Sequence, residues 1–379
     1  MTSFNPRVKY PIYIAIYALV IAGLFLLFQG FPMIIIILKY FIFPGILFLI
    51  SGALFYDWYE RKVYAHMQTR IGPRFIQPVF DVLKLLAKED ITPDGVDKPE
   101  FSLIPPFQLL IALLIAFLMP VYIAEGLISF EVDLIFFLFL LAVIGSTILL
   151  LGWTSNNPYG LIGGSRAAVA QFSFEIPLTI AFIGPAILAG SLRISDIVRS
   201  KFNLIDLPLN VIFQRNGFTM MHLLYLIPLL ILFAIAILAA NAVLEKVPFD
   251  PEHAEVEIVG GWMVELSGKK FLFCLLANRV TEFALAGIIA AVFFGGPGFS
   301  PLNTCVNGIL FIGSWDIFQY LINIVTFFIK TTVIVFLITL VRAIHARFRI
   351  DQLIRYFWRY YLPVALLALF MIVFLVGVI

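Results

Sequence analysis

The chain has 379 residues, 62% of them hydrophobic and only 13% charged, with a formal net charge of +2 at neutral pH. A mean hydropathy of +1.04 lies far from the balance of a soluble globular protein and excludes that class. We therefore expect an integral membrane protein, with the lipid bilayer among its partners and no nucleic acid.

Apolar runs long enough to cross a bilayer recur along the chain. A spanning helix takes roughly 20 residues, and about nine runs have this length. They predict an all-α, polytopic fold in a single membrane domain over residues 1–379, and they exclude a β-barrel. The predicted spans lie at residues 11–28, 34–56, 103–124, 133–152, 168–190, 222–243, 272–295, 319–341 and 361–379.

Long segments between these spans fall on the same side of the membrane as the N-terminus. Most of the 25 Lys and Arg residues lie on that side, and the positive-inside rule makes it cytoplasmic. The sequence thus predicts a cytoplasmic N-terminus. The predicted cytoplasmic loops are residues 57–102, 153–167, 244–271 and 342–360.

Residues that commonly hold metals or clusters are scarce. Cys274 and Cys305 are the only cysteines, and they are far apart in apolar surroundings, which excludes an iron–sulfur cluster or a cysteine zinc site. The four histidines show no paired metal spacing, and no nucleotide-binding motif is present. We expect no metal ligands, no catalytic residues and no cofactor bound by this chain, so any redox cofactor must come from a partner.

The first long loop contains an amphipathic segment. Asp81, Lys84 and Lys88 fall on one helical face, and apolar residues cover much of the remainder. This pattern predicts a helix that lies on the membrane surface and does not span it. The plainer alternative is an ordinary interfacial helix that joins two spans.

The next loop delivers Glu175 into the start of a span. An ionisable residue at membrane depth is costly and usually faces protein or water, which indicates a group on an ion or proton path. The alternative is a carboxylate that caps or reaches the interface. Arg166 is either its counter-charge or a cytoplasmic-side anchor.

Residues 247–268, "VPFDPEHAEVEIVGGWMVELSG", form an acidic loop with five carboxylates. If the segment is helical, Glu252 and Glu255 share a face. Crowded, partly desolvated carboxylates raise one another's pKa and could hold and pass protons. A solvated acidic loop is the alternative, but the interleaved Phe249, Ile258 and Trp262 favour a half-buried segment.

Five motifs, in this order, resemble those of one family of complex I membrane subunits, the H subunit, whose mitochondrial counterpart is NADH dehydrogenase subunit 1. The family includes the equivalent membrane subunits of archaeal membrane-bound hydrogenase and sulfane sulfur reductase. The resemblance implies a core over residues 31–365, preceded by an extra helix at residues 10–30. The motifs are "YERKVYAHMQTRIGP", "QPVFDVLKLLAKED", "GWTSNNPYGLIGGSRAAVAQFSFEIPL", "PFDPEHAEVEIVGGWMVELSG" and "RIDQLIRYFWRYYLPVAL".

The resemblance implies a connector subunit in the cell membrane of a prokaryote. In this family the cytoplasmic loops dock a peripheral arm made of iron–sulfur subunits and a large catalytic subunit, and the membrane face meets antiporter-like subunits. The implied function couples electron transfer to H⁺ or Na⁺ translocation, with iron–sulfur clusters in partners and quinone in a shared cavity. The chain itself would contain no redox centre and would be inactive alone.

Roles for individual residues follow from the same resemblance. The implied ion-coupling path contains Glu175, Asp81, Glu252, Glu255, Glu257 and Glu265. The implied cavity mouth or docking surface contains Glu60, Arg61, Arg70, Arg74, Arg166 and Asp250. Charges predicted within spans are Arg279, Glu282 and Lys330.

The sequence leaves open the branch of the family and two alternatives to the coupling function. The short "RIGPRFIQP" segment is more like the hydrogenase and sulfane reductase branch, whereas "GWTSNN" and "RAAVAQ" are more like the quinone branch. Phe174 stands where relatives usually have tyrosine. The alternatives to coupling are a stand-alone secondary ion transporter or channel, supported by the charges within spans, and a purely structural anchor for a redox arm.

Overall fold

The computed structural model describes residues 38–200, 202–208, 220–298 and 316–378. Within these residues it contains helices and no β-strand, and eight helices are long and apolar enough to cross a membrane. The all-α, polytopic prediction is confirmed, and eight of the predicted spans correspond to helices. The first predicted span, at residues 11–28, lies outside the described residues.

The long helices are α3 (Ile46–Met67), α5 (Lys98–Phe117), α6 (Asp133–Thr154), α7 (Pro158–Ala189), α10 (Leu226–Val243), α12 (Gly268–Phe294), α14 (Asp316–Ile344) and α16 (Leu362–Val378). The shorter elements are α4 (Gln77–Ala87), α8 (Ile194–Arg199), η2 (Met220–Tyr225), η3 (Pro251–His253), α11 (Glu255–Ile258), η4 (Gly261–Met263), α15 (Ile350–Tyr356) and the π-helical turn η5 (Phe357–Tyr361).

Two helices begin or end well away from the predicted boundaries. Helix α3 continues through Met67 and so carries Asp57, Glu60 and Arg61 on a helix that the sequence placed partly in a loop. Helix α7 begins at Pro158, with the Asn157 side chain accepting a hydrogen bond from the Tyr159 backbone N–H at 2.9 Å. Hydropathy missed this first part because it is rich in glycine, whereas an asparagine cap followed by proline is a helix start.

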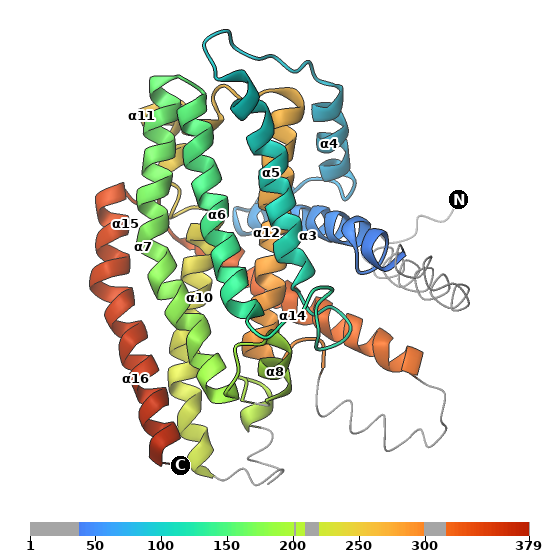
Figure 1. Ribbon diagram of the computed structural model, residues 1–379, viewed down its shortest axis with the longest axis vertical. Helices are drawn as coiled ribbons and strands as arrows, with labels where there is room; N and C mark the ends of the chain where they lie inside the picture. The colour runs from blue at the N-terminus through green and yellow to red at the C-terminus, as the bar shows by residue number, and fades with distance from the viewer. Residues whose placement is uncertain (1–37, 201, 209–219, 299–315, 379) are drawn as a thin grey trace.

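Helix α12 lies at the centre of the bundle. Helices α5, α3 and α14 pack directly against it, while α7 packs against α6, α10 and α16. In Figure 1, α5, α6, α7, α10, α12 and α16 run along the long axis, and α3 and α14 are inclined to them. Fully buried small residues let the neighbours of α12 approach closely; they include Ala284, Ala286, Ala290 and Ala291.

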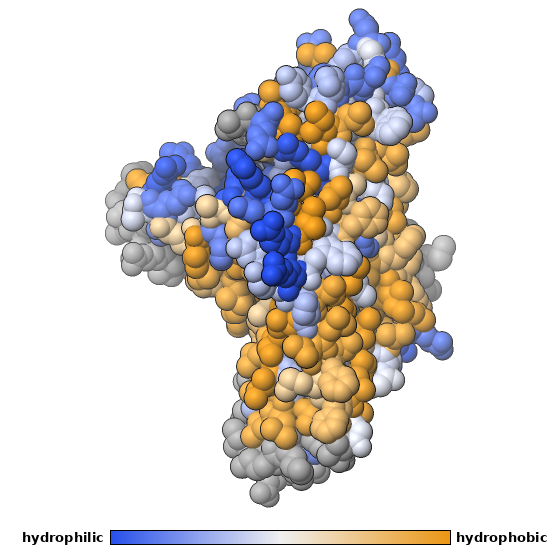
Figure 2. Space-filling model, turned by 90° about the vertical axis from the view of Figure 1, so that its left-hand side faces the viewer, coloured by the Kyte–Doolittle hydropathy of each residue, from blue (hydrophilic) through white to orange (hydrophobic). Residues whose placement is uncertain are grey.

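Polar side chains gather toward one end of the molecule. Figure 2 shows hydrophilic residues in the upper half of one face and a hydrophobic surface below them. Helix α4 packs on α3 and α12 and leaves Val79, Phe80, Leu83 and Leu86 exposed. Its amphipathic character agrees with the predicted interfacial helix.

The acidic loop packs on the first turns of α7 because glycine makes room for it. The Trp262 side chain is fully buried there. The loop is divided between η3 and α11, with Ala254 between them in a non-helical conformation. Glu252 and Glu255 therefore do not share one continuous helix.

Replacing Gly163 with alanine is expected to displace this loop. A Cβ atom at Gly163 would lie 2.6 Å from the Gly261 Cα and 2.7 Å from the Trp262 backbone nitrogen, and backbone atoms cannot move aside as the ends of flexible side chains can. The free energy of unfolding should fall by about 1–3 kcal/mol, and amide hydrogen exchange should rise across residues 252–265. The control is Gly95→Ala, whose Cβ would meet nothing within 4 Å; equal effects in the two variants would contradict the expectation.

Candidate functional site

Two groups of buried or partly buried polar side chains lie close to the acidic loop. The first, which we name the charge network, consists of Asp57, Glu60, Arg61, Asp81, Lys246, Arg279, Glu282 and Arg342. The second, which we name the acidic cavity, lies between α6 and α7 and is lined by Gln171, Glu175, Glu245 and Glu252 together with apolar residues.

Glu60 is the centre of the charge network and has no solvent-exposed surface. Its Oε1 atom accepts a hydrogen bond from Arg342 at 2.9 Å and forms an ion pair with Lys246 Nζ at the same distance. Its Oε2 atom lies 3.3 Å from an Arg279 nitrogen. Lys246 also contacts Glu282 at 2.5 Å. A buried carboxylate with several cationic partners avoids the cost of an unpaired charge.

The network continues outward to the surface helix α4. Asp57 forms ion pairs with Arg279 Nε at 2.9 Å and with Arg61 at 2.8 Å. Arg61 in turn reaches Asp81 of α4 at 2.7 Å. With four carboxylates and four cations, the network is formally neutral, and it connects the surface to the centre of the bundle.

Separate parts of the chain supply these side chains. Asp57, Glu60 and Arg61 are spaced three and four residues apart and so share one face of α3. Arg279 and Glu282 are three residues apart on α12. Lys246 follows the end of α10, and Arg342 lies in the last turn of α14. The network therefore forms only when these four helices pack together.

Asp81 is the outermost carboxylate of the network. Partial burial raises its pKa, but hydrogen bonds from Arg61 and Gln77 outweigh that effect and hold its pKa below the ordinary value. A carboxylate with a lowered pKa stabilises the folded state above its unfolded-state pKa, and this stabilisation is lost as the pH falls through the lowered value.

Asp81→Asn is therefore expected to loosen α4 at neutral pH. Because the Asp81 and Arg61 side chains are each about one-third exposed, the effect should stay below about 1 kcal/mol. Hydrogen exchange of α4 amides, corrected for intrinsic rates, should rise in the variant at pH 7, and the difference from wild type should vanish in acid below the pKa of Asp81. The exposed Asp94, changed to Asn, is the control. A difference that grows toward acid would contradict the assignment.

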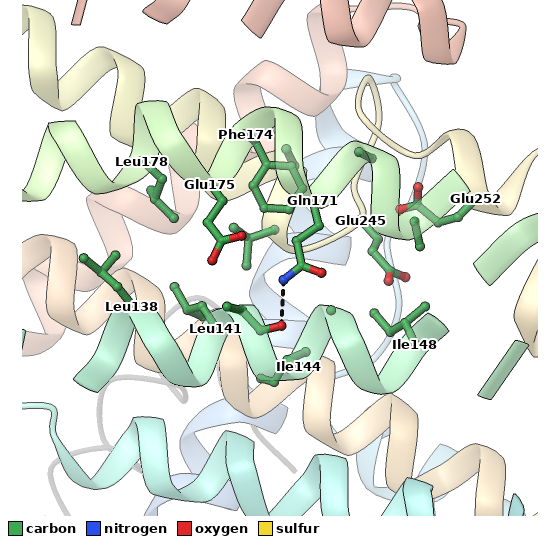
Figure 3. A pocket seen from close by; sticks show the side chains of 16 residues that line it. Leu138, Leu141, Ile144, Ile148, Gln171, Phe174, Glu175, Leu178, Glu245 and Glu252 are labelled. Carbon is green, nitrogen blue, oxygen red and sulfur yellow. Dashed lines mark hydrogen bonds between the residues drawn. The ribbon is translucent and has the colours of Figure 1, made fainter. Parts of the chain in front are cut away.

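The acidic cavity is narrow, because the centre of a water molecule has only about 30 Å³ in which to move inside it. Gln171 and Glu175 project into it from α7, and Gln171 crosses to α6, where its Nε2 donates to the Ala142 carbonyl at 2.6 Å (Figure 3). Gly145 leaves the space for this amide, since a Cβ there would collide with it. Leu138, Leu141 and Ile144 form much of the apolar wall.

Glu175 is partly buried in this cavity. Among the residues that the structure describes, no cation lies within ion-pair distance of its carboxylate. Arg166 pairs instead with Glu257 at 2.6 Å. Of the two roles considered for Arg166, the counter-charge of Glu175 is thus not the one observed. Glu175 therefore faces a largely apolar space, where its charge has no ionic compensation from the described residues.

Glu245 and Glu252 lie at the other end of the acidic cavity from Glu175 (Figure 3). Burial, together with the nearby charge of Glu245, raises the pKa of Glu252 well above its ordinary value. His253 Nε2 lies 2.6 Å from a Glu245 oxygen. Burial lowers the pKa of His253, but the charges of Glu245 and Glu252 outweigh it and raise that pKa to about 9.

Comparison with known proteins identifies the family. A family model described as NADH dehydrogenase matches residues 38–373. The chain belongs to the NADH dehydrogenase family. It is 35% identical over 315 residues to the H subunit of the NADH-quinone oxidoreductase of Brevibacillus brevis, covering 82% of this chain and 84% of the relative. It is 34% identical over 345 residues to the protein of the same name from Bacillus thuringiensis, covering 88% of this chain and 93% of the relative. The resemblance seen in the five motifs is confirmed.

Other predicted site residues of this NADH dehydrogenase family member lie outside both groups. Asp250 is buried and pairs with Arg347 at 3.0 Å; burial raises its pKa, and Arg347 partly offsets the rise. Glu265 accepts from Asn157 at 2.6 Å. Arg70 and Arg74 are both exposed. The side chain of Glu255 lies outside the described residues.

The Lys330 ammonium group is held by backbone carbonyls at the end of α12, which gives this residue a structural role. Its Nζ donates to the carbonyls of Phe294, Gly296 and Gly298 at 2.6, 2.8 and 2.6 Å. A cation at the end of α12 stabilises the free carbonyls and the negative end of the helix dipole. Gly295, with φ of 73°, ends the helix there.

Sequence reasoning missed several members of both groups. Asp57, Lys246 and Arg342 belong to the charge network, and Glu245 and Gln171 line the acidic cavity. The i, i+3, i+4 spacing of Asp57 with Glu60 and Arg61 was a usable signal, as was the pair Glu245–Lys246 directly after an apolar run. Gln171 carried no signal of its own, because an amide within a span is recognised only from what it contacts.

Proposed function

We propose that this chain is the membrane-embedded connector subunit of a complex I-like respiratory oxidoreductase. It would dock a peripheral arm of iron–sulfur subunits and the large catalytic subunit, meet antiporter-like subunits within the membrane, and couple electron transfer to H⁺ or Na⁺ translocation. Two relatives named as the H subunit of NADH-quinone oxidoreductases support this proposal and favour quinone as the electron acceptor.

The acidic cavity is the observation that carries the coupling proposal. It places Glu175, a carboxylate with no ionic partner among the described residues, in one space with Gln171, Glu245 and Glu252. A carboxylate without a fixed counter-charge can change protonation at small cost, whereas the fully buried Glu60, which three cations surround, cannot. The cavity connects the acidic loop to the interior of the bundle.

The proposed mechanism starts in the peripheral arm. Reduction chemistry there changes the charge or conformation at the acidic loop, this change alters the protonation of Glu175, and the effect passes to the ion-translocating partners. The proposed path contains Glu175, Asp81, Glu252, Glu255, Glu257 and Glu265. The chain itself would contribute no redox centre: iron–sulfur clusters would stay in partner subunits, and quinone would bind as substrate in a cavity shared with them.

The charge network gives the proposed connector a rigid part. It joins α3, α12 and α14 to the surface helix α4 through direct ion pairs. The proposed docking surface contains Arg61, Arg70, Arg74 and Arg166, while Glu60 and Asp250, which are buried, would act from beneath it. We further propose that this end faces the cytoplasm of a prokaryotic cell, as the distribution of Lys and Arg predicts. Arg279, Glu282 and Lys330, which would favour a stand-alone transporter, all have partners within the chain.

The connector proposal is tested by gentle detergent extraction from native membranes, followed by identification of every chain that co-purifies and of the bound iron and nickel. The expected result is co-purification with iron–sulfur subunits and iron without nickel. Nickel would indicate a hydrogenase-type assembly. Recovery of this chain alone, under conditions that preserve other membrane complexes, would overturn the connector role and favour a transporter.

A further inference from the structure

Three potential metal ligands meet at the loop end of the acidic cavity, although the spacing of the histidines in the sequence suggests no metal site. Glu245 follows the end of α10, while Glu252 and His253 belong to η3. One ligand atom from each residue lies within 4.8 Å of the other two. The turn between α10 and η3 thus brings together side chains that are seven and eight residues apart in the sequence.

Two of the oxygen atoms in this cluster have no partner. Glu245 Oε1 and Glu252 Oε2 are buried and make no hydrogen bond, and the Glu252 residue is only 2% exposed. Buried polar atoms are nearly always satisfied, and a buried carboxylate oxygen without a donor is costly. These two atoms are therefore open positions for a ligand that carries positive charge.

The cluster is also accessible from the acidic cavity. Glu245 and Glu252 both line it, and Figure 3 shows their carboxylates together at one end of the space between α6 and α7. The Trp262 ring packs beside His253, with ring centroids 5.8 Å apart. The His253 side chain is thus held by packing beside two carboxylates that line the acidic cavity.

We propose that Glu245, Glu252 and His253 bind a divalent cation of the Zn²⁺ type. One imidazole nitrogen with two carboxylates is a donor set that suits Zn²⁺, and three protein ligands would leave a fourth position for water. Mg²⁺ and Ca²⁺ instead require six or more oxygen ligands, which this cluster does not offer. Binding needs neutral His253 and replaces its 2.6 Å contact with Glu245 by two metal–ligand bonds of about 2.0–2.2 Å.

The first test measures Zn²⁺ binding to the purified protein in detergent, together with the subunits that co-purify. We expect one tight site in the wild type, with one imidazole and oxygen donors by X-ray absorption spectroscopy. His253→Gln and Glu252→Gln should each weaken the affinity at least about tenfold, because even loss of an outer-shell partner commonly costs that much. His345→Gln, at an exposed histidine, is the matched control and should bind normally. Wild-type affinity in His253→Gln would overturn the proposal.

A second measurement needs no variant and so holds even if the substitutions prevent folding. Diethyl pyrocarbonate modifies neutral imidazoles, so the reaction is run at mildly alkaline pH, where part of His253, whose pKa is raised to about 9, is neutral. Mass spectrometry reports the modification of each histidine. Zn²⁺ should slow the modification of His253 and leave that of His345 unchanged, while Mg²⁺ at the same concentration should protect neither. Equal modification of His253 with and without Zn²⁺ would overturn the site, and protection by Mg²⁺ would overturn the assigned metal class.

Discussion

Glu175→Gln is expected to reduce coupled ion translocation at least about tenfold, since proton transfer by a positioned side chain commonly contributes a factor of about 10²–10⁴. Glutamine has nearly the same shape and keeps the packing of the acidic cavity, but it cannot take up or release a proton in the physiological range. The measurement is ion translocation by the purified complex in proteoliposomes, with electron transfer recorded in parallel.

The controls for this prediction separate coupling from structure. Glu175→Asp keeps a titratable group and should retain part of the activity, while Glu100→Gln, at an exposed glutamate, should behave as wild type. The Glu175→Gln complex should contain every subunit. Full coupled activity in this variant would remove Glu175 from the path, whereas loss of partner subunits would favour the structural-anchor alternative.

Glu60→Gln is expected to lower the free energy of unfolding by about 3–5 kcal/mol, the usual cost of breaking a buried ion pair from one side. Three cations surround this carboxylate, and Lys246 is itself nearly buried, with 7% of its side chain exposed. Removing the negative charge leaves the network with one uncompensated positive charge. Unfolding by dodecyl sulfate in mixed micelles would measure the loss.

A second substitution tests whether charge balance is the cause. Glu60 is the ion-pair partner of Arg342 among the described residues, so Glu60→Gln combined with Arg342→Met restores neutrality. We expect the double variant to recover part of the stability that Glu60→Gln loses. Losses that simply add would mean that shape and not charge determines the effect. The exposed Glu89, changed to Gln, should alter stability by less than about 0.5 kcal/mol.

The spans were predictable because a bilayer-crossing helix makes all its backbone hydrogen bonds within one segment, so its signal is local. The ends of these helices were less predictable. The glycine-rich start of α7 has low hydropathy yet is helical, because its glycines allow close packing. Gly163 packs against the loop at Gly261 and Trp262, and Gly160 and Gly164 pack against the end of α6. The polar end of α3 was assigned to a loop, although its charges are paired within the protein and can therefore remain in a helix.

The candidate site was likewise predictable only in part. Single residues with an unusual position, such as Glu175 within an apolar run, could be selected from the sequence alone, because an uncompensated charge there is costly wherever the helices pack. The ion-pair partners of these residues could not be selected from the sequence. Arg166 lies nine residues before Glu175 in the sequence but pairs with Glu257, which comes from a distant loop. Ion pairing depends on separations of a few ångströms, which only packing determines.

The sequence by itself determined the membrane class, the helical fold, the family and the polar loops, because each depends on composition or on short ordered motifs. The tertiary structure alone decided which charges neutralise one another and which stay open. It joined Glu60 to Lys246, Arg279 and Arg342 from three other parts of the chain, and it brought Glu245, Glu252 and His253 together at the end of a cavity. The physical reason is that the energy of a buried charge depends on neighbours within a few ångströms, and packing rather than sequence distance selects those neighbours.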